Sequence, residues 1–177
     1  MKLKYLVLLA VTGTIISLDQ LTKHLVTQRF RLGESLQIIA GFFNLTYVHN
    51  PGAAFGLLAR TDASFRIPFF IIVPILALGI IFYVFRNVED RDLKLSTALS
   101  LVIGGAFGNL IDRATYNHVI DFLDFHWNYQ IHFPTFNIAD IAICLGVGFL
   151  ILDILQKDKA SKKMDKSSSQ PSEPVQS

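Results

Sequence analysis

The chain has 177 residues, of which 51% are hydrophobic and only 17% are charged. Its mean hydropathy of +0.44 is too apolar for an ordinary soluble domain, so the length sets a number of membrane spans rather than a number of domains. The net charge of +2 specifies no partner, and the single cysteine, Cys144, excludes an internal disulfide framework.

Four apolar stretches predict four transmembrane helices. The first covers about residues 4–26 and is interrupted by Asp19 and Lys23; no small-x-small cleavage site follows it, so we interpret it as a retained signal anchor. The second, about residues 67–85, contains no charge and is long enough to span a bilayer. The third and fourth cover about residues 95–113 and 138–155. The predicted fold is an all-α membrane protein with four transmembrane helices.

Two loops, about residues 28–65 and 114–136, are expected on one side of the membrane. Residues 45–48 favour a strand, Asn50-Pro51-Gly52 is turn chemistry, and residues 118–127 mix β-branched and aromatic side chains. We therefore expect a small extracytoplasmic β-sheet platform on the outer membrane surface. Five aromatic residues are expected to sink into the headgroups: Phe42, Phe43, Phe55, Phe125 and Trp127.

The distribution of lysine and arginine predicts the orientation. These residues concentrate at positions 2–4, 86–94 and 157–166, whereas residues 114–136 contain none, although the first outer loop holds three arginines. Cytoplasmic loops carry the excess of positive charge, so both termini are expected in the cytoplasm. Residues 1–156 are predicted to form one membrane domain. Residues 157–177, rich in Lys, Ser, Gln and Pro, are predicted to be a disordered cytoplasmic tail.

Three predicted helix ends each bring a pair of polar residues to the outer membrane level. Each pair is spaced by three or four positions and so lies on one helix face. Simple explanations exist for each: an interfacial ion pair, a snorkelling arginine, and a helix cap with an acid in the first turn. Their convergence at one depth instead indicates a site. The pairs are Asp19 with Lys23, Asn109 with Arg113, and Asn137 with Asp140.

Asp140 needs a partner, because an unpaired charge at bilayer depth is costly. Two nearby carboxyl groups can share a proton, so that one acts as base and the other as acid. Such a pair activates water for amide hydrolysis without a metal or cofactor. Asp112, Asp121 and Asp124 are candidates for the second acid; Asp112 looks like an ion-pair partner of Arg113, and periodicity does not choose between the other two.

Five motifs resemble, in order, those of the bacterial lipoprotein signal peptidase family, signal peptidase II. They are DQLTK (19–23), NPGAAFG (50–56), GGAFGNLIDR (104–113), VIDF (119–122) and FNIAD (136–140), and the resemblance extends from about residue 4 to residue 155. It implies a four-helix aspartic endopeptidase of the cytoplasmic (inner) membrane, with its active site at the extracytoplasmic face. Such enzymes remove the signal peptide of prolipoproteins, cutting before a cysteine that already carries diacylglycerol.

The resemblance also assigns roles to individual residues. It implies that Asp121 and Asp140 are the catalytic pair, with neither metal nor cofactor. It implies substrate positioning by Asn50, Asn109, Arg113 and Asn137, with Asp19 and Lys23 in support. Gly52, Ala53 and Ala54 are expected to let a peptide backbone approach closely. The expected partners are lipid-modified prolipoproteins and membrane lipid, with no nucleic acid, and a monomer is favoured.

Three other hypotheses receive less support. A cysteine enzyme would use Cys144, but a thiol buried that far into apolar surroundings is poorly reactive. A metalloprotease could recruit His118, His126 and His132, yet HExxH is absent and the spacing fits no standard site. An ion carrier built on Asp19 and Asp140 would need an exit at the inner helix ends, which hold only ordinary flanking charges.

Overall fold

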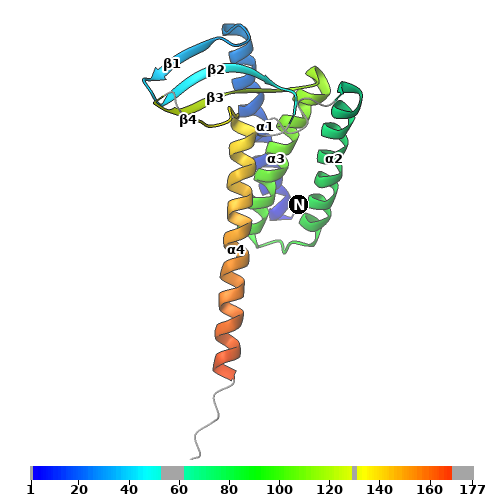
Figure 1. Cartoon of the computed structure of the whole chain (residues 1–177). Coiled ribbons are helices and arrows are strands. Elements are labelled where there is room, and N and C mark those ends of the chain that lie inside the picture. The colour runs from blue at the N-terminus through cyan, green and yellow to red at the C-terminus, as the bar shows by residue number, and fades with distance from the viewer. Residues whose placement is uncertain (1, 53–61, 129–130, 169–177) are drawn as a thin grey trace, which may run out of the picture.

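The computed structural model describes residues 2–52, 62–128 and 131–168. This part of the chain forms four helices and four strands (Figure 1). They are α1 (Leu3–Arg29), β1 (Ser35–Ile39), β2 (Phe43–Asn50), α2 (Ala63–Asn87), α3 (Leu93–Tyr116), β3 (Val119–Trp127), β4 (Ile131–His132) and α4 (Ile138–Ser168).

All four helices are long and apolar enough to cross a membrane, which confirms the predicted all-α membrane fold. They run alongside one another, and the sheet covers one end of the bundle (Figure 1). Every helix extends beyond its predicted bounds at one end or both. At the starts of α2 and α3, the extension ends at an aspartate cap. Asp62 accepts a hydrogen bond from the Ser64 amide at 2.8 Å, and Asp92 accepts one from the Leu95 amide at 3.0 Å.

The centre of the bundle is α3, which packs against α1 on one side and α4 on the other. Small residues allow this close approach. A Cβ atom on Gly146 of α4 would lie 2.6 Å from Cγ2 of Val102 and 2.7 Å from the carbonyl oxygen of Ala98, both on α3. By contrast, α2 buries little of its apolar surface and contacts mainly α3. The third helix is therefore the scaffold on which site residues are held.

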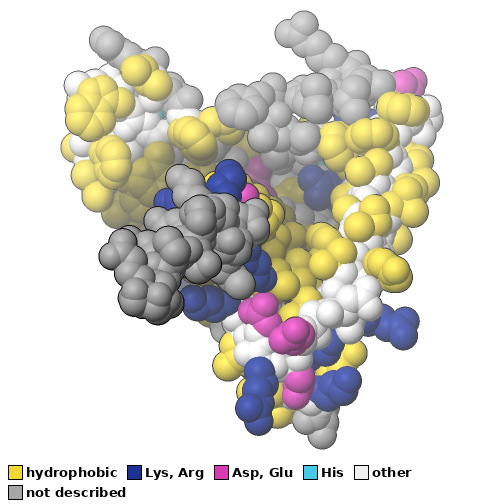
Figure 2. All heavy atoms as spheres, turned by 90° about the horizontal axis from the view of Figure 1, so that it is seen from below, with side chains coloured by type: hydrophobic (Ala, Val, Ile, Leu, Met, Phe, Trp, Pro, Cys, Tyr) yellow, Lys and Arg dark blue, Asp and Glu magenta, His cyan; other side chains and the backbone are white. Residues whose placement is uncertain are grey.

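At the end opposite to the sheet, Lys4 closes the carboxyl end of α2. Its buried ammonium group donates to the carbonyl oxygens of Phe85, Arg86 and Val88 at 3.3, 2.8 and 2.6 Å. A cation at this position satisfies the free carbonyls and complements the helix dipole. Seen from this end, hydrophobic side chains cover the outer faces of the helices, and Lys and Arg side chains gather around their ends (Figure 2).

The predicted platform is present as a four-stranded antiparallel sheet in the order β1-β2-β3-β4. Strand β2 contains the predicted residues 45–48, and β3 corresponds to the second β-rich stretch. Strand β1 was not predicted, and it lies at the edge of the sheet with all its residues exposed. In the β2–β3 register, Val48 is opposite Asp121 and Asn50 is opposite Val119, so the end of β2 lies beside the start of β3.

The aromatic residues of the platform divide into two groups. Phe43 and Phe125 stack with their ring centroids 4.6 Å apart and are half-buried, so they hold β2 against β3. Phe42 and Trp127 are exposed and remain available to the headgroup region. Phe55, like Ala53 and Ala54, lies outside the described residues.

The predicted boundary of a disordered tail at residue 157 is wrong. Helix α4 continues through Lys157 to Ser168 and projects beyond the other three helices (Figure 1). Ion pairs at i and i+4 support this extension: Lys157 contacts Asp153 at 2.6 Å and Lys162 contacts Asp158 at 2.8 Å. Lysine is also a good helix former, so a polar composition alone did not end the helix.

Candidate active site

The three polar pairs predicted at the outer helix ends do come together, under the sheet. The end of α1 brings Asp19 and Lys23, α3 brings Asn109, and the first turn of α4 brings Asp140 with its cap Asn137. Direct hydrogen bonds connect these elements into one network, whereas Arg113, the sixth predicted residue, lines the adjoining cavity.

A buried lysine is the positive centre of the network. The ammonium of Lys23 lies 2.8 Å from a carboxylate oxygen of Asp19 and 2.8 Å from one of Asp112, and it donates to the side-chain oxygen of Asn109 at 3.1 Å. The predicted pairing of Asp112 with Arg113 is therefore wrong. Successive residues of a helix point in different directions, and here Asp112 turns toward α1. All three ionic groups are at most 1% exposed.

Sequence reasoning missed Gln20. Its amide nitrogen donates to Asp112 at 2.9 Å, to Asp19 at 3.2 Å and to the carbonyl oxygen of Gly108 at 3.2 Å. A polar residue beside Asp19 within an apolar span was the available signal, because such residues usually face the bundle interior.

Gly108 allows α1, α3 and α4 to meet at this level. A Cβ atom there would lie 2.6 Å from Oδ2 of Asp19 and 3.2 Å from Cβ of Ala139. The other oxygen of Asp19 accepts the amide of Ala139 at 2.9 Å, which fixes the start of α4 against α1. Asp19 and Lys23 therefore anchor the helix turn that carries Asp140.

Asn137 and Asp140 cap α4 reciprocally. The side-chain oxygen of Asn137 accepts the Asp140 amide at 3.0 Å, and Oδ2 of Asp140 accepts the Asn137 amide at 3.2 Å. The other oxygen of Asp140 accepts a hydrogen bond from Asn109 at 2.8 Å. An acidic residue in the first turn is a favoured position at the start of a helix. The predicted cap is confirmed, and it leaves Asp140 at the wall of a cavity.

The same Asn137 reaches the second carboxyl group. Its side-chain nitrogen donates to Oδ1 of Asp121 at 2.7 Å, while Asn50 donates to Oδ2 at 2.9 Å. Burial and the nearby charge of Asp140 raise the pKa of Asp121 to about 6, and the two hydrogen bonds oppose this shift. Asp121 and Asp140 are thus both bonded to one residue, and Asp121 is the carboxyl group that keeps its proton more readily than usual.

Asp124, the other candidate in β3, belongs to the opposite face of the sheet. Side chains alternate along a strand, so residues three positions apart point to opposite faces. Asp124 accepts a hydrogen bond from the hydroxyl of Thr46 at 2.9 Å, on β2. Asp121 instead faces the helix ends. The geometry therefore separates the two aspartates that periodicity had left as alternatives.

A cavity of about 630 Å³ opens beside Asp140. Asn50, Gly52, Asn109 and Arg113 contribute the polar part of its lining, and the rest is mostly apolar. The guanidinium of Arg113 lies 3.5 Å from the carbonyl oxygen of Gly52 and over the ring of Phe70. The Gly52 amide donates to Asn50 at 3.1 Å, closing the predicted turn. The apolar lining comprises Pro74, Ala106, Val119, Phe133, Pro134, Phe136, Ile141, Ile143 and Leu145, with Thr135 and Cys144.

The histidines and the cysteine of the competing hypotheses are distributed over several elements, although His126 is opposite His132 in the β3–β4 register. Cys144 lies in α4 and lines the cavity, whose wall is mostly apolar. His118 stacks on His49 with ring centroids 3.7 Å apart, whereas His126 is buried within β3. Among the residues described, no group of three His, Cys, Asp or Glu side chains could hold a metal ion.

Four membrane-spanning helices with buried aspartates beside an apolar cavity define a polytopic membrane protein with a polar site at one helix end. Comparison with known proteins specifies the class further. Residues 11–156 match the family model described as Signal peptidase (SPase) II. The chain belongs to the signal peptidase II family.

Individual relatives agree with this assignment. The lipoprotein signal peptidase of Syntrophus aciditrophicus is 48% identical over 90% of this chain and 98% of its own length. That of Syntrophotalea carbinolica is 47% identical over 84% of this chain and 91% of its own. A solved bacterial membrane enzyme superposes with a TM-score of 0.75 at 32% identity, covering 94% of this chain and 93% of the other. A second gives 0.72 at 30% identity, covering 84% and 92%.

Proposed function

We propose that this protein is an aspartic endopeptidase that removes signal peptides from diacylglyceryl-modified prolipoproteins, cutting before the lipidated cysteine, with Asp121 and Asp140 as its catalytic pair. The observation that carries the proposal is the position of Asn137. One residue binds both carboxyl groups, at 2.7 and 3.2 Å, beside a cavity with a largely apolar lining. Such a cavity suits lipid chains, and the carboxyl pair suits amide hydrolysis.

The proposed roles follow from the environments of the two carboxyl groups. Asp140 lines the cavity and is the base: it takes a proton from a water molecule, whose oxygen attacks the scissile carbonyl carbon. Asp121, whose pKa is raised to about 6, is the acid that donates its proton to the carbonyl oxygen. As the tetrahedral species collapses, Asp140 gives its proton to the leaving nitrogen and the C–N bond breaks. Asp121 takes back a proton from the tetrahedral species, so both carboxyl groups return to their starting states. The signal peptide leaves with a carboxyl group, and the lipidated cysteine leaves with an amine.

In this scheme Asn50 separates Asp121 from the cavity. Asp121 is 1% exposed, and Asn50, which lines the cavity, donates a hydrogen bond to its Oδ2 atom. The substrate carbonyl replaces Asn50 as the hydrogen-bond partner. Losing one donor to the ionised carboxylate raises the pKa of Asp121 further, which strengthens it as a proton donor when substrate is bound.

The remaining polar residues of the cavity position the peptide. Arg113 and Asn109 donate to substrate carbonyl groups, and Gly52 lets the backbone pass close to the wall. Asn137 holds the two carboxyl groups in fixed positions relative to each other. Asp19 and Lys23 do not contact the substrate in this scheme, and they act by fixing the turn of α4 that carries Asp140. Fixed positioning of this kind contributes several kcal/mol to catalysis in enzymes generally.

The proposed location is the cytoplasmic membrane, with both termini in the cytoplasm and the site at the extracytoplasmic face. The lysines of the α4 extension, Arg86 in the last turn of α2 and Arg91 between α2 and α3 support this orientation, because they lie at the end opposite to the sheet. The scissile bond of a membrane-anchored precursor then meets the carboxyl pair at the depth of the helix ends. The enzyme acts as a monomer and uses no metal or cofactor.

The test is incubation of the detergent-purified protein with a precursor peptide carrying a diacylglyceryl cysteine, beside the same peptide without lipid. We expect cleavage of the lipidated peptide immediately before the cysteine, unchanged by EDTA, and negligible cleavage of the other. The matched peptide keeps the cleavage sequence constant, so the comparison isolates the lipid. Equal cleavage of both peptides, or none of the lipidated one, contradicts the proposed substrate class. Full inhibition by EDTA contradicts the metal-free mechanism.

A further inference from the structure

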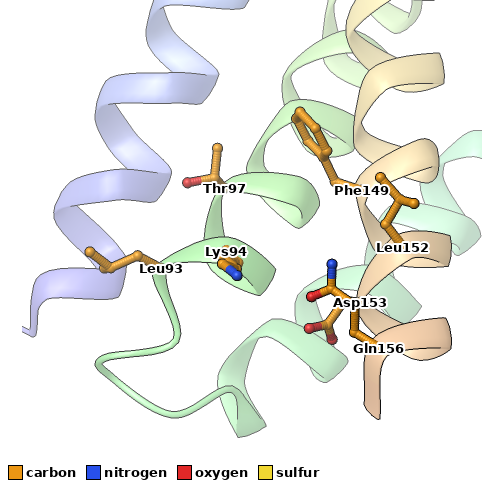
Figure 3. Close-up of a pocket in the computed structure, with 7 residues that line it drawn as sticks. All are labelled: Leu93, Lys94, Thr97, Phe149, Leu152, Asp153 and Gln156. Atoms are coloured by element: carbon orange, nitrogen blue, oxygen red, sulfur yellow. The ribbon is translucent and has the colours of Figure 1, made fainter. Parts of the chain in front are cut away.

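A second cavity, of about 480 Å³, lies at the opposite end of the bundle from the sheet. It is formed between the first turns of α3 and the middle of α4, and Figure 3 shows its lining residues on the two facing helices. It shares none of its lining with the cavity beside Asp140. The lining consists of Leu93, Lys94, Thr97, Phe149, Leu152, Asp153 and Gln156.

The cavity is polar at one end and apolar at the other. Helix α4 runs away from the sheet, so Phe149 and Leu152 lie deeper in the membrane than Asp153 and Gln156. Helix α3 runs the opposite way and places Lys94 at the outer rim of this cavity, one turn from Thr97. Such a gradient, from charged groups at the bundle end to apolar groups toward its middle, matches the gradient along a phospholipid molecule.

The polar groups on the rim have unused hydrogen-bonding capacity. Lys94, Thr97 and Gln156 make no side-chain hydrogen bond or ion pair with any residue that the structure describes. Asp153 contacts Lys157 through Oδ2 at 2.6 Å, and Oδ1 has no such partner within the described ranges. In Figure 3, Asp153 and Gln156 point from α4 toward Lys94. Donors and an acceptor thus face one apolar-walled cavity.

The charges at the rim balance. Lys157 lies between Asp153 and Asp92, at 2.6 and 3.6 Å, and Lys94 supplies the second cation. Two carboxylates and two ammonium groups give no net charge. The site therefore complements a ligand that is neutral overall but carries separated charges, and it offers no excess cation to an anionic headgroup.

We propose that this cavity binds one glycerophospholipid with a zwitterionic headgroup ending in a primary amine, from the leaflet opposite to the proposed active site. Lys94 and the Thr97 hydroxyl donate to its phosphate. Its ammonium group donates to Oδ1 of Asp153 and to the Gln156 carbonyl, and its acyl chains lie along Phe149 and Leu152. A choline headgroup has no N–H to donate to these acceptors, and an anionic glycerol headgroup lacks the cation that Asp153 attracts. This inference goes beyond the proposed function and does not depend on it.

Native mass spectrometry of the full-length protein, released from detergent, tests this proposal. The probes are phosphatidylethanolamine, phosphatidylcholine and phosphatidylglycerol with identical acyl chains. We expect one phosphatidylethanolamine to bind about fivefold more tightly than either of the others, since one exposed charge-assisted contact contributes up to about 1 kcal/mol. Lys94→Gln should lower its affinity about fivefold. Asp153→Asn should abolish the preference for ethanolamine over choline.

Two control variants distinguish this site from general electrostatic effects. Lys159→Gln removes an exposed lysine of α4 outside the cavity and should leave lipid affinity unchanged. Lys157→Gln breaks the same ion pair as Asp153→Asn but keeps the carboxylate, so it should preserve the ethanolamine preference. Equal binding of the three lipids, tighter binding of phosphatidylglycerol, or an unchanged affinity in Lys94→Gln overturns the proposal. Loss of the preference in Lys157→Gln does so too. Precursor cleavage in detergent should be unchanged in all four variants.

Discussion

Asp140→Asn and Asp121→Asn should each reduce cleavage of a lipidated precursor by about a thousandfold or more, because each removes one member of an acid–base pair. An amide at position 140 cannot take a proton from water. An amide at position 121 cannot donate the proton that the carbonyl oxygen needs. Single-turnover cleavage with enzyme in excess measures this loss directly, since product release and substrate affinity then contribute little.

The matched control is Asp124→Asn, which makes the same change three residues away on the other face of β3. Asp124 bonds Thr46 on the platform and does not reach the helix ends, so its loss should change the rate by about twofold at most. All three variants should remain folded, as judged by thermal unfolding in detergent. Near-normal turnover in either dyad variant, or complete loss in Asp124→Asn, would show that the catalytic pair is misassigned.

Lys23→Met should be the most destabilising single change in the bundle. It removes the cation between Asp19 and Asp112 and leaves two carboxylates, each at most 1% exposed, without their counter-ion. Removing one partner of a buried ion pair costs about 3–5 kcal/mol, which corresponds to a fall in melting temperature of about 10 °C for a protein of this size. Activity should fall with it, because Asp19 holds the Ala139 amide beside Asp140.

A double variant separates the ionic network from a simple packing defect. Lys23→Met with Asp112→Asn removes one of the uncompensated carboxylates, so it should be more stable than Lys23→Met alone. Lys159→Met makes the same substitution on the exposed face of α4 and should leave the melting temperature within about 2 °C of the unmodified protein. If the melting temperature of Lys23→Met equals that of the unmodified protein, the structural role assigned to this network is wrong.

Most of the fold could be predicted from the sequence, because membrane spans depend on local composition. The apolar stretches identified all four helices, and turn chemistry at Asn50 and Gly52 located the end of β2. Strand β1 was missed because its residues are exposed, so no alternation of buried and exposed positions identified it. The continuation of α4 to Ser168 was missed because ion pairs and helix propensity sustain it without an apolar face.

The candidate site could be predicted only in part. Spacing alone identified Asp140 with its cap Asn137, and Asp19 with Lys23, because both are local arrangements within one helix turn. Spacing along the chain does not predict which residues of different elements contact each other. The partner of Asp112 turned out to be Lys23 on another helix, and the choice of Asp121 over Asp124 came from a family resemblance. Which face of β3 meets the helix ends is fixed by its pairing with β2, which periodicity does not specify.

The central claim is that two carboxyl groups, joined through Asn137, hold one proton between them for use in catalysis. A carboxyl group whose pKa is raised in the folded protein binds its proton over a wider pH range, and loses it only as the pH rises through that value.

Infrared difference spectroscopy across a pH titration, comparing the unmodified protein with Asp121→Asn, measures that proton most directly. We predict a protonated-carboxyl band, absent in Asp121→Asn, that disappears as the pH rises through about 6. The value of kcat/KM, which reports the free enzyme, should fall over the same interval. A carboxyl group at position 121 that is already ionised at pH values well below this, near the ordinary range for aspartate, would contradict the account.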